Sequence, residues 1–382
     1  MKSRFDLPTI HDPQVSLTAA VSLADLPGFF EFVDNQTVLR LSRQGGKPGF
    51  RDTASLQRLT GTVSRRLLAP HVTPLTLIQG LEQQLAHQTG VQLRDCDAVL
   101  LCHSHAEPDA AVRLAREAAA RLALPPTKVC GWNFGCSGFI QLLCEAVQML
   151  QHRSEIQRLV LLNVEAPETW HCSADRVFCG IVGAGATGVL LERTDTSSLR
   201  RGLQVKAIGR SELPVPVQPN EGPLFYREDC PAWTFRGRPY RTTVMRMNAE
   251  QVFVQGIELM LGALRAASHT TSATTGRPAI ILPHQPSGKL LNALFTLAQQ
   301  EFPNFHFLQN LTHHGNTISC TIPQMLTELP AVCIQNSVDT QANPLLIGVS
   351  AGICMQKMED HMSVGFVVLD GEWPMPPTFG SK

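Results

Sequence analysis

Short apolar runs alternate with longer amphipathic stretches along the first half of the chain. Ala98–Cys102, Val129–Asn133 and Leu159–Val164 are almost continuously apolar, which predicts strands that are buried or lead into a functional turn. Asp109–Leu122 is rich in Ala, Leu and Arg and predicts a helix, and Gly183–Leu191 predicts a glycine-rich turn into a further strand. This alternation is typical of an α/β protein.

The second half of the chain follows the same order. Ala279–Leu282 predicts a strand, and Leu290–Leu297 predicts the helix after it. Phe305–Leu308 then leads into a turn and a helix that extends through Pro323 to Leu329. Strand, polar turn, helix and strand therefore recur in the order seen before.

The chain is predicted to close with two strands around a glycine loop, over Leu345-Leu346-Ile347-Gly348, Ser350-Ala351-Gly352 and Val364–Leu369. The repeated order suggests an internal duplication, with one half over residues 1–200 and the other over residues 201–382.

Two segments do not fit the repeated order. Residues 200–241 carry much irregular sequence rich in Pro, Gly and charge, and we expect them to connect the halves. Residues 29–49 are expected to form an insertion or a covering loop, whose role the sequence does not give.

Composition removes several classes of function. Of 382 residues, 43% are hydrophobic, which is ample for a globular core. Lys and Arg total 32 and so do Asp and Glu, so the chain lacks the basic charge of a general nucleic-acid binder. The 11 cysteines have no repeated spacing, which argues against a disulfide framework and fits a reducing compartment. Without a long apolar run, a cytoplasmic protein that does not enter a membrane is expected.

Cys136 is the first candidate for chemistry. It lies in the run Asn133-Phe134-Gly135-Cys136-Ser137-Gly138-Phe139, directly before an amphipathic helical pattern. The nearby glycines allow a sharp turn, and the unpaired N–H groups at the helix start favour a thiolate over a thiol. A buried core cysteine is the other interpretation, and it fits most cysteines of this chain.

His284 and Asn316 are the other two candidates. His284 follows a predicted strand in Pro283-His284-Gln285, and Asn316 lies in the turn His314-Gly315-Asn316-Thr317. Brought beside Cys136, they would give the nucleophile two hydrogen-bonding partners. A satisfied histidine at a strand end and an ordinary left-handed turn residue are the alternatives that stay open here.

These three runs, in this order and inside a duplicated α/β pattern, resemble the β-ketoacyl synthase III enzymes of the thiolase superfamily. The resemblance extends over most of the chain. It implies a thiolase fold in which duplicated βαβαβαββ halves form a five-layered α/β/α/β/α structure. It also implies a homodimer and a reaction without cofactor or metal.

The resemblance also implies a role for each residue. Cys136 would attack an acyl thioester and hold the acyl group covalently. The backbone N–H groups of Cys136 and Ala351 would stabilise the oxyanion, and His284 and Asn316 would stabilise the enolate of a malonyl-type thioester. Acyl carrier protein or acyl coenzyme A would supply the thioesters.

Several positions depart from the family's pattern. Ser55 stands where an aromatic residue commonly stacks on the adenine of coenzyme A, whereas Lys289 keeps a basic carrier-binding position. Gly183-Ala184-Gly185-Ala186 lacks the usual acidic residue. His103-Ser104-His105-Ala106-Glu107-Pro108 stands where an apolar aromatic residue is common near the acyl pocket. We interpret this segment as a solvated loop, with an unusual acyl group or a reshaped pocket as the alternatives.

The leading hypothesis is therefore condensation of an acyl group on Cys136 with a malonyl or β-ketoacyl thioester in a secondary-metabolite pathway. The alternative is an acyltransferase that moves the group to oxygen or nitrogen, with His284 as general base. Acyl chain length, the choice of carrier and the product stay open.

Three other functions fit the sequence poorly. A papain-like protease has a different run around its cysteine, near the mature N-terminus. A silent partner subunit tends to lose the nucleophile that this chain keeps. Cys102 with His103 and His105, or His171 with Cys172, could suggest a metal, but no second pair lies at ligand spacing.

Overall fold

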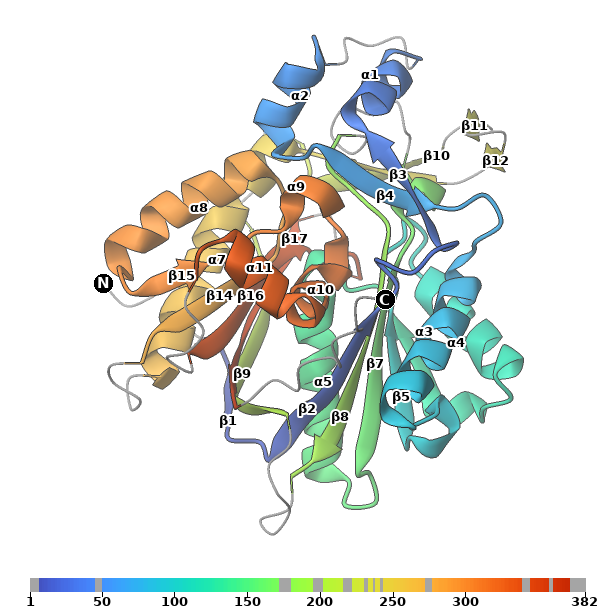
Figure 1. Ribbon diagram of the computed structural model, residues 1–382, viewed down its shortest axis with the longest axis vertical. Coiled ribbons are helices and arrows are strands. Elements are labelled where there is room, and N and C mark those ends of the chain that lie inside the picture. The colour runs from blue at the N-terminus through green and yellow to red at the C-terminus, as the bar shows by residue number, and fades with distance from the viewer. Residues whose placement is uncertain are drawn as a thin grey trace, which may run out of the picture.

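The computed structural model describes residues 7–44, 50–171, 180–194, 202–215, 222–229, 233–235, 238–240, 243–271, 277–338, 344–356 and 360–371, and the description below is of these residues. They form a large mixed β-sheet with helices on its faces (Figure 1). No helix in these ranges is long and apolar enough to cross a membrane.

The N-terminal half contributes five strands in the order β6-β5-β7-β8-β2. Their bounds are β2 Val15–Ser22, β5 Ala98–Cys102, β6 Val129–Trp132, β7 Arg158–Glu165 and β8 Gly185–Arg193. β5 lies parallel to β6 and β7, whereas β8 lies antiparallel to β7 and β2. Parallel strands covered on both faces require continuous apolar runs, which is the pattern of the sequence here.

The C-terminal half contributes the order β15-β14-β16-β17-β9. Its bounds are β9 Leu203–Pro214, β14 Ala279–Pro283, β15 Phe305–Phe307, β16 Leu345–Ile353 and β17 His361–Asp370. β14 is parallel to β15 and β16, and β17 is antiparallel to β16 and β9. Both halves thus place their strands in the order third, second, fourth, fifth, first.

The two sets of strands meet where β9 pairs with β2 at Ser16 opposite Gln204 and Leu17 opposite Leu203. With β1 (Thr9–His11) paired to β9, this gives one 11-stranded sheet. The predicted border between residues 200 and 201 lies outside the described residues.

Helices complete five layers, as predicted. α3 (Pro74–Thr89) and α4 (Ala110–Arg121) cover the outer face of the N-terminal strands, and α7 (Ala249–Thr271) and α8 (Gly288–Glu301) cover that of the C-terminal strands (Figure 1). α5 (Gly138–His152) and α10 (Thr321–Thr327) lie between the two sets of strands and contact both.

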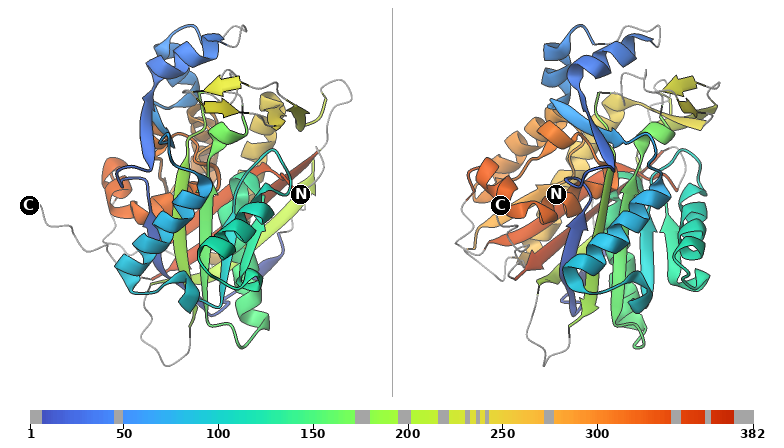
Figure 2. Two further views of the ribbon diagram at one scale, coloured as in Figure 1. Left: turned by 90° about the vertical axis from the view of Figure 1, so that its right-hand side faces the viewer. Right: turned by 45° about the vertical axis from the view of Figure 1, so that its right-hand side comes forward.

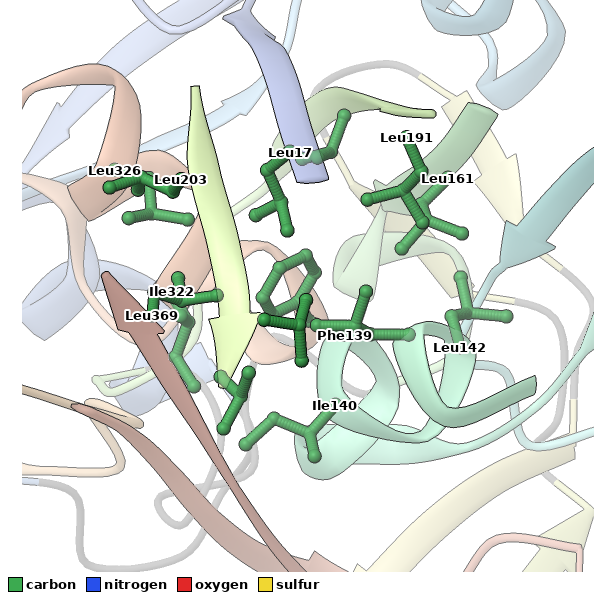
Figure 3. Close-up of a cluster of buried hydrophobic side chains, with 14 of the residues drawn as sticks. Leu17, Phe139, Ile140, Leu142, Leu161, Leu191, Leu203, Ile322, Leu326 and Leu369 are labelled. Atoms are coloured by element: carbon green, nitrogen blue, oxygen red, sulfur yellow. The ribbon is translucent and has the colours of Figure 1, made fainter. Parts of the chain in front are cut away.

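The middle layer explains the apolar character of α5. Phe139, Ile140 and Leu142 lie among side chains of both halves (Figure 3). A helix that contacts protein on all sides must be apolar nearly all round, in contrast to a surface helix with one apolar stripe. The labelled partners in this cluster are Leu17, Leu161, Leu191, Leu203, Ile322, Leu326 and Leu369.

Residues 29–49 do not form only a loop. β3 (Phe30–Asp34) pairs with β4 (Ser64–Leu68), and α1 (Asn35–Gln44) and α2 (Thr53–Thr60) lie beside this ribbon at one end of the molecule (Figures 1 and 2). A small apolar cluster of its own, which includes Leu56 and Phe50, holds this part together.

Two further predictions need correction. Residues 200–241 were expected to connect the halves, but they contain β9, the first strand of the second half, as well as short strands. The glycine loop expected near Gly348 and Gly352 is continuous strand in β16. Glycine is required there by close neighbours, since a Cβ at Gly348 would lie 2.9 Å from Val367 and one at Gly352 would overlap the Cβ of Cys136.

The remaining short elements connect the layers. They are the strands β10 Phe225–Asp229, β11 Trp233–Phe235, β12 Arg238–Tyr240 and β13 Thr243–Met247, the helices α9 Leu311–His314 and α11 Leu329–Gln335, and the 3₁₀ helices Leu93–Asp95, Pro126–Lys128, Gly135–Ser137, Pro167–Thr169 and Ile318–Cys320.

Candidate active site

Cys136 lies at a sharp turn between β6 and α5. The turn is a 3₁₀ helix over Gly135–Ser137, and Gly135 has a φ of 65°, a left-handed conformation that glycine adopts without strain. A Cβ on Gly135 would lie 2.8 Å from the carbonyl oxygen of Ile353 in β16. Together with the contact of Gly352 on Cys136, this places Cys136 directly against the end of β16.

His284 follows directly after β14 and is held by its backbone. Its N–H donates to the carbonyl of Val349 at 2.8 Å, and the neighbouring Gln285 amide donates to the carbonyls of Pro283 at 3.1 Å and Leu308 at 3.2 Å. The imidazole is almost completely buried, yet neither ring nitrogen has a hydrogen-bond partner among the described residues. The backbone of Ile318 lies close enough to the ring to influence its pKa, and at least one ring nitrogen is available to a ligand.

Burial also sets the protonation state of His284. It lowers the pKa of the imidazole to about 3, and the backbone of Ile318 opposes this lowering only in part. The ring is consequently neutral near pH 7 and can take up a proton or donate one from a single nitrogen.

Asn316 is placed by a close contact between two chain segments. Its N–H donates to the carbonyl of Ile181 at 2.8 Å, and its carbonyl accepts from Gly183 at 2.9 Å. The segments can approach this closely because a side chain at Gly183 would strike the carbonyl of His314, and one at Gly315 would lie 2.9 Å from that of Ile181. The glycines that flank Asn316 in space thus fix its backbone.

The side chain of Asn316 is oriented by Ile318. The Ile318 N–H donates to Asn316 Oδ1 at 2.9 Å, which leaves Nδ2 with only a long 3.5 Å contact to the carbonyl of Pro286. Ile318 itself has a φ of 54°, which is rare for a β-branched residue and costs about 1–3 kcal/mol. Strained backbone therefore turns the amide N–H groups of Asn316 away from the protein's own acceptors.

A polar network supports the same turn from behind. His314 Nδ1 accepts hydrogen bonds from Arg66 and from Gln324 (2.9 Å), and His314 Nε2 lies 3.1 Å from Glu328. Burial alone would raise the pKa of Glu328, but the bonds from His314 and its neighbours lower it overall. Arg66 also pairs with Asp25 at 3.0 Å, so both halves of the chain contribute to the network.

One cavity brings the predicted catalytic residues together. It has a volume of about 190 Å³, and Cys136, His284, Asn316 and Ala351 all line it. Most of the other lining residues are apolar. The three runs singled out in the sequence therefore meet at one place, although 148 residues separate Cys136 from His284 in the chain.

Lys289 and Ser55 lie outside the lining of this cavity. The Lys289 side chain is at the exposed start of α8, with Nζ 5.4 Å from the ring centre of Phe253, which does line the cavity. The hydroxyl of Ser55 bonds to Asp52 at the start of α2 and so serves the helix end.

The thiol of Cys136 differs from the sequence prediction. Burial raises its pKa to about 12, and the negative charge of Glu165 adds to the effect. Burial therefore outweighs the stabilisation of the thiolate that was expected from the helix end. Cys136 holds its proton and needs a base at the moment of attack.

Glu165 is a functional candidate that sequence reasoning missed. It ends β7, is completely buried, and accepts hydrogen bonds from the Ser104 N–H at 3.2 Å and from the hydroxyls of Ser104 (2.9 Å) and Ser319. Burial raises its pKa to about 8, against those bonds. Within an apolar strand a single Glu gives no sequence signal of burial, because its partners come from distant segments.

The loop His103-Ser104-His105 is not solvated, contrary to the expectation. His103 and Ser104 are buried, and His103 Nδ1 lies 2.7 Å from the carbonyl of Val164. The side chain of Asn133, just before the nucleophile turn, bonds to the backbone of His105. This loop therefore supports the turn from behind and does not line the cavity.

In the ranges described, no three His, Cys, Asp or Glu side chains come close enough together to hold a metal ion. His171 is buried, with Nδ1 facing the carbonyl of Pro167, and Cys172 lies outside the described residues.

No family model matches the chain. Two proteins named β-ketoacyl-[acyl-carrier-protein] synthase III are similar in sequence. The one from Prochlorococcus marinus is 25% identical over 271 residues, which cover 70% of this chain and 77% of the relative. The one from Porphyra purpurea is 24% identical over 269 residues, covering 70% and 78%.

Solved structures share the fold over nearly the whole chain. 3-Oxoacyl-(acyl carrier protein) synthase III of Pseudomonas aeruginosa PAO1 superposes with a TM-score of 0.67 at 19% identity, covering 94% of this chain and 98% of that one. The priming β-ketosynthase of a polyketide biosynthetic pathway gives a TM-score of 0.68 at 17% identity, covering 98% and 100%. The thiolase fold predicted from the sequence is confirmed.

Glu165→Gln tests the buried carboxyl. Because the folded protein holds this proton up to about pH 8 and the unfolded chain only to about 4.5, wild-type stability should fall as the pH rises through this window. In the Glu165→Gln variant, the decrease in the free energy of unfolding over this pH range should be smaller by about 1–3 kcal/mol. Denaturant unfolding from pH 5 to 8 measures it, with the exposed Glu155→Gln as control. Parallel pH profiles for Glu165→Gln and wild type would show that Glu165 is already ionised at low pH.

Proposed function

We propose that this chain, a β-ketoacyl synthase III-like condensing enzyme of the thiolase superfamily, works through an acyl thioester on Cys136. The observation that carries the proposal is that Cys136, His284 and Asn316 line the same apolar cavity. The Cys136 thiol and the His284 imidazole that line this cavity are both neutral near pH 7. Neither group therefore has to lose a charge before a substrate binds.

Loading of the enzyme follows from these protonation states. The Cys136 sulfur forms a bond to the acyl carbon while its proton passes to His284, and the bond to the donor's sulfur then breaks. The departing thiolate takes the proton from His284. During this step the backbone N–H groups of Cys136 and Ala351 would stabilise the oxyanion, which a low-dielectric site favours strongly.

Condensation uses the polar groups that the protein leaves free. The carbonyl of a malonyl thioester would accept hydrogen bonds from His284 and from Asn316 Nδ2, which have no close partner of their own. The bond to the carboxylate breaks and carbon dioxide leaves, and the two donors stabilise the enolate. Its carbon attacks the acyl group, and the Cys136 sulfur departs and regains a proton.

An acyltransferase is the second candidate, because the free nitrogens of His284 could also deprotonate an alcohol or amine. The orientation of Asn316 favours condensation. Simple transfer needs one base, whereas an enolate benefits from two donors, and the bond from the Ile318 N–H to Asn316 Oδ1 leaves Nδ2 as such a second donor.

The donor is proposed to be carried by an acyl carrier protein. The Ser55 hydroxyl is engaged in capping α2 and offers no aromatic surface for adenine, whereas the exposed Lys289 ammonium stands beside Phe253 at the cavity. A secondary-metabolite pathway, a homodimer and a cytoplasmic location belong to the same proposal. The polyketide priming enzyme among the structural neighbours supports the first of these.

Loading should occur on Cys136 alone. After incubation with an acyl thioester, intact-mass measurement should show one acyl group on the wild type and none on Cys136→Ala, because no other described cysteine lines the cavity. Cys144→Ala is the matched control and should load normally, because Cys144 is buried within α5 and does not line the cavity. Peptide mapping that placed the group elsewhere would contradict the assignment.

Lys289→Glu should lower kcat/KM for a carrier-bound substrate by about tenfold while changing that for the same group on coenzyme A much less, since a charge reversal acts on a charged protein partner. Arg116→Glu on the outer helix α4 controls for net charge. Equal effects of both reversals on both substrates would remove the carrier-binding role.

Asn316→Ala separates the two candidate reactions. It should still acquire the acyl group but condense about 10²–10³-fold more slowly, the usual cost of one oxyanion donor. His284→Ala should lose at least as much, and the double variant little more. Exposed Asn292→Ala serves as control.

The release of carbon dioxide from malonyl thioester measures this step directly. Two results together would favour acyl transfer over condensation. Asn316→Ala would form product from an alcohol or amine at nearly the wild-type rate, and the wild type would release no carbon dioxide from malonyl thioester.

A further inference from the structure

Arg66 is a buried cation between the β3–β4 ribbon and the turn of Asn316. It lies in β4, beside α9, the helix that leads into that turn (Figure 1). Only 3% of the residue is exposed, and it does not line the cavity. Its guanidinium bonds to His314 on one side and to Asp25 Oδ1, at 3.0 Å, on the other. Removal of a guanidinium from water costs free energy, which these bonds have to offset.

The partners of His314 fix its tautomer. Its Nδ1 faces two donors, Arg66 and Gln324 Nε2 (2.9 Å), and its Nε2 lies 3.1 Å from the carboxylate of Glu328. An arginine N–H can only donate, so Nδ1 has to accept and the ring hydrogen lies on Nε2. A hydrogen on Nδ1 would collide with the N–H groups that point at it. Arg66 thus holds His314 in one tautomer and one orientation.

Arg66 also holds the other side of the turn, through its backbone. Its carbonyl accepts from the Ala184 N–H at 2.7 Å, and the adjacent Gly183 N–H donates to the carbonyl of Asn316 at 2.9 Å. Its side chain bonds to His314, two residues before Asn316. One residue of the N-terminal half therefore contacts both segments between which Asn316 is placed.

The ring of Phe32 covers Arg66 from outside. The two residues pair across the β3–β4 ribbon, and the guanidinium carbon lies 5.0 Å from the centre of the ring. Phe32 is itself 66% exposed, so its outer face meets water while its ring lies over the buried cation. The face of an aromatic ring attracts a cation, and more strongly where water is excluded. Removal of the ring would open Arg66 to water.

We infer that Arg66 is a positioning residue for condensation, which sets the direction of the Asn316 amide by holding His314 in one tautomer. The Phe32 ring keeps this arrangement dry. The inference rests on the proposed role of Asn316 as a donor to the enolate. A displacement of about 1 Å at a reacting group can cost about 10²-fold in rate, so a residue outside the cavity can act on the reaction in this way. Loading of Cys136 does not use Asn316 and should not depend on Arg66.

The test compares the two steps of the reaction. Arg66→Met removes the donor but keeps an unbranched side chain. It should load Cys136 within about twofold of the wild type and release carbon dioxide from malonyl thioester about 10–100-fold more slowly, in kcat and not in KM. Arg66→Lys keeps a charge and a donor, so it should recover most of this loss. Arg116→Met, on the outer helix α4, is the matched control. Equal losses in both steps, or normal release of carbon dioxide by Arg66→Met, would overturn the inference.

Phe32→Ala repeats the test from the surface and decides it if Arg66→Met does not fold. Release of carbon dioxide should fall by about three- to tenfold, as expected for loss of a cation–aromatic contact that excludes water. Most substitutions of exposed side chains change little. Leu297→Ala, exposed on α8 and outside the cavity, is the matched control. Wild-type release by Phe32→Ala would overturn the role given to the ring.

Nuclear magnetic resonance keeps this inference separate from the proposed reaction. In protein labelled with nitrogen-15 in histidine and asparagine, the His314 ring, assigned with His314→Asn, should carry its hydrogen on Nε2. Arg66→Met should lose the fixed tautomer and shift the side-chain amide signals of Asn316, assigned with Asn316→Asp. If these signals change but the wild type releases no carbon dioxide, the proposed reaction fails and the positioning by Arg66 stands. Unchanged signals in Arg66→Met overturn the inference, whatever the rates are.

Discussion

The contact between the end of β16 and the turn that carries Cys136 is the constraint on which the site depends. Gly352 leaves no room for a side chain beside the Cys136 Cβ, and Gly135 approaches the carbonyl of Ile353 equally closely. Because β16 also carries Ala351 and holds the backbone of His284 through Val349, one strand positions the proposed nucleophile Cys136, Ala351 and His284. The middle helix α5, buried between both halves, keeps the turn pressed against that strand.

The shared strand order of the halves shows how similar positions acquired different roles. Cys102 lies opposite Asn163 as Pro283 lies opposite Val349, so His103 corresponds to His284 and Glu165 to Ala351. In the N-terminal half the histidine bonds to a carbonyl and the glutamate to two serines, and both support the turn. In the C-terminal half the histidine lines the cavity and has no side-chain hydrogen-bond partner among the described residues. The corresponding positions thus differ in role. Those of the N-terminal half stabilise the turn that carries Cys136, whereas those of the C-terminal half place polar groups in the cavity.

Much of this could be predicted from the sequence because it depends on local pattern. The buried strands and the three motif runs follow from apolar runs and from glycine, histidine and asparagine at their ends. The strand β9 was predicted as a connection because polar residues alternate along it. The strand β16 was predicted as two pieces around a loop, because its glycines, which tertiary contacts require, resemble a turn in the sequence. The high pKa of the Cys136 thiol and the burial of Glu165 and His103 also escaped, since desolvation depends on segments far apart in the chain.

Ile318 carries a consequence for how this sequence can change over generations. A branched residue in left-handed backbone is less favourable there than glycine or asparagine, and the protein bears this cost even when the cavity is empty. Its backbone N–H fixes the direction of the Asn316 amide, and its side chain is buried on the apolar wall of the cavity. A glycine at position 318 would relieve the backbone and keep this N–H, but it would remove that part of the wall. A strained position can therefore persist where a backbone donor and a packed side chain depend on the same residue.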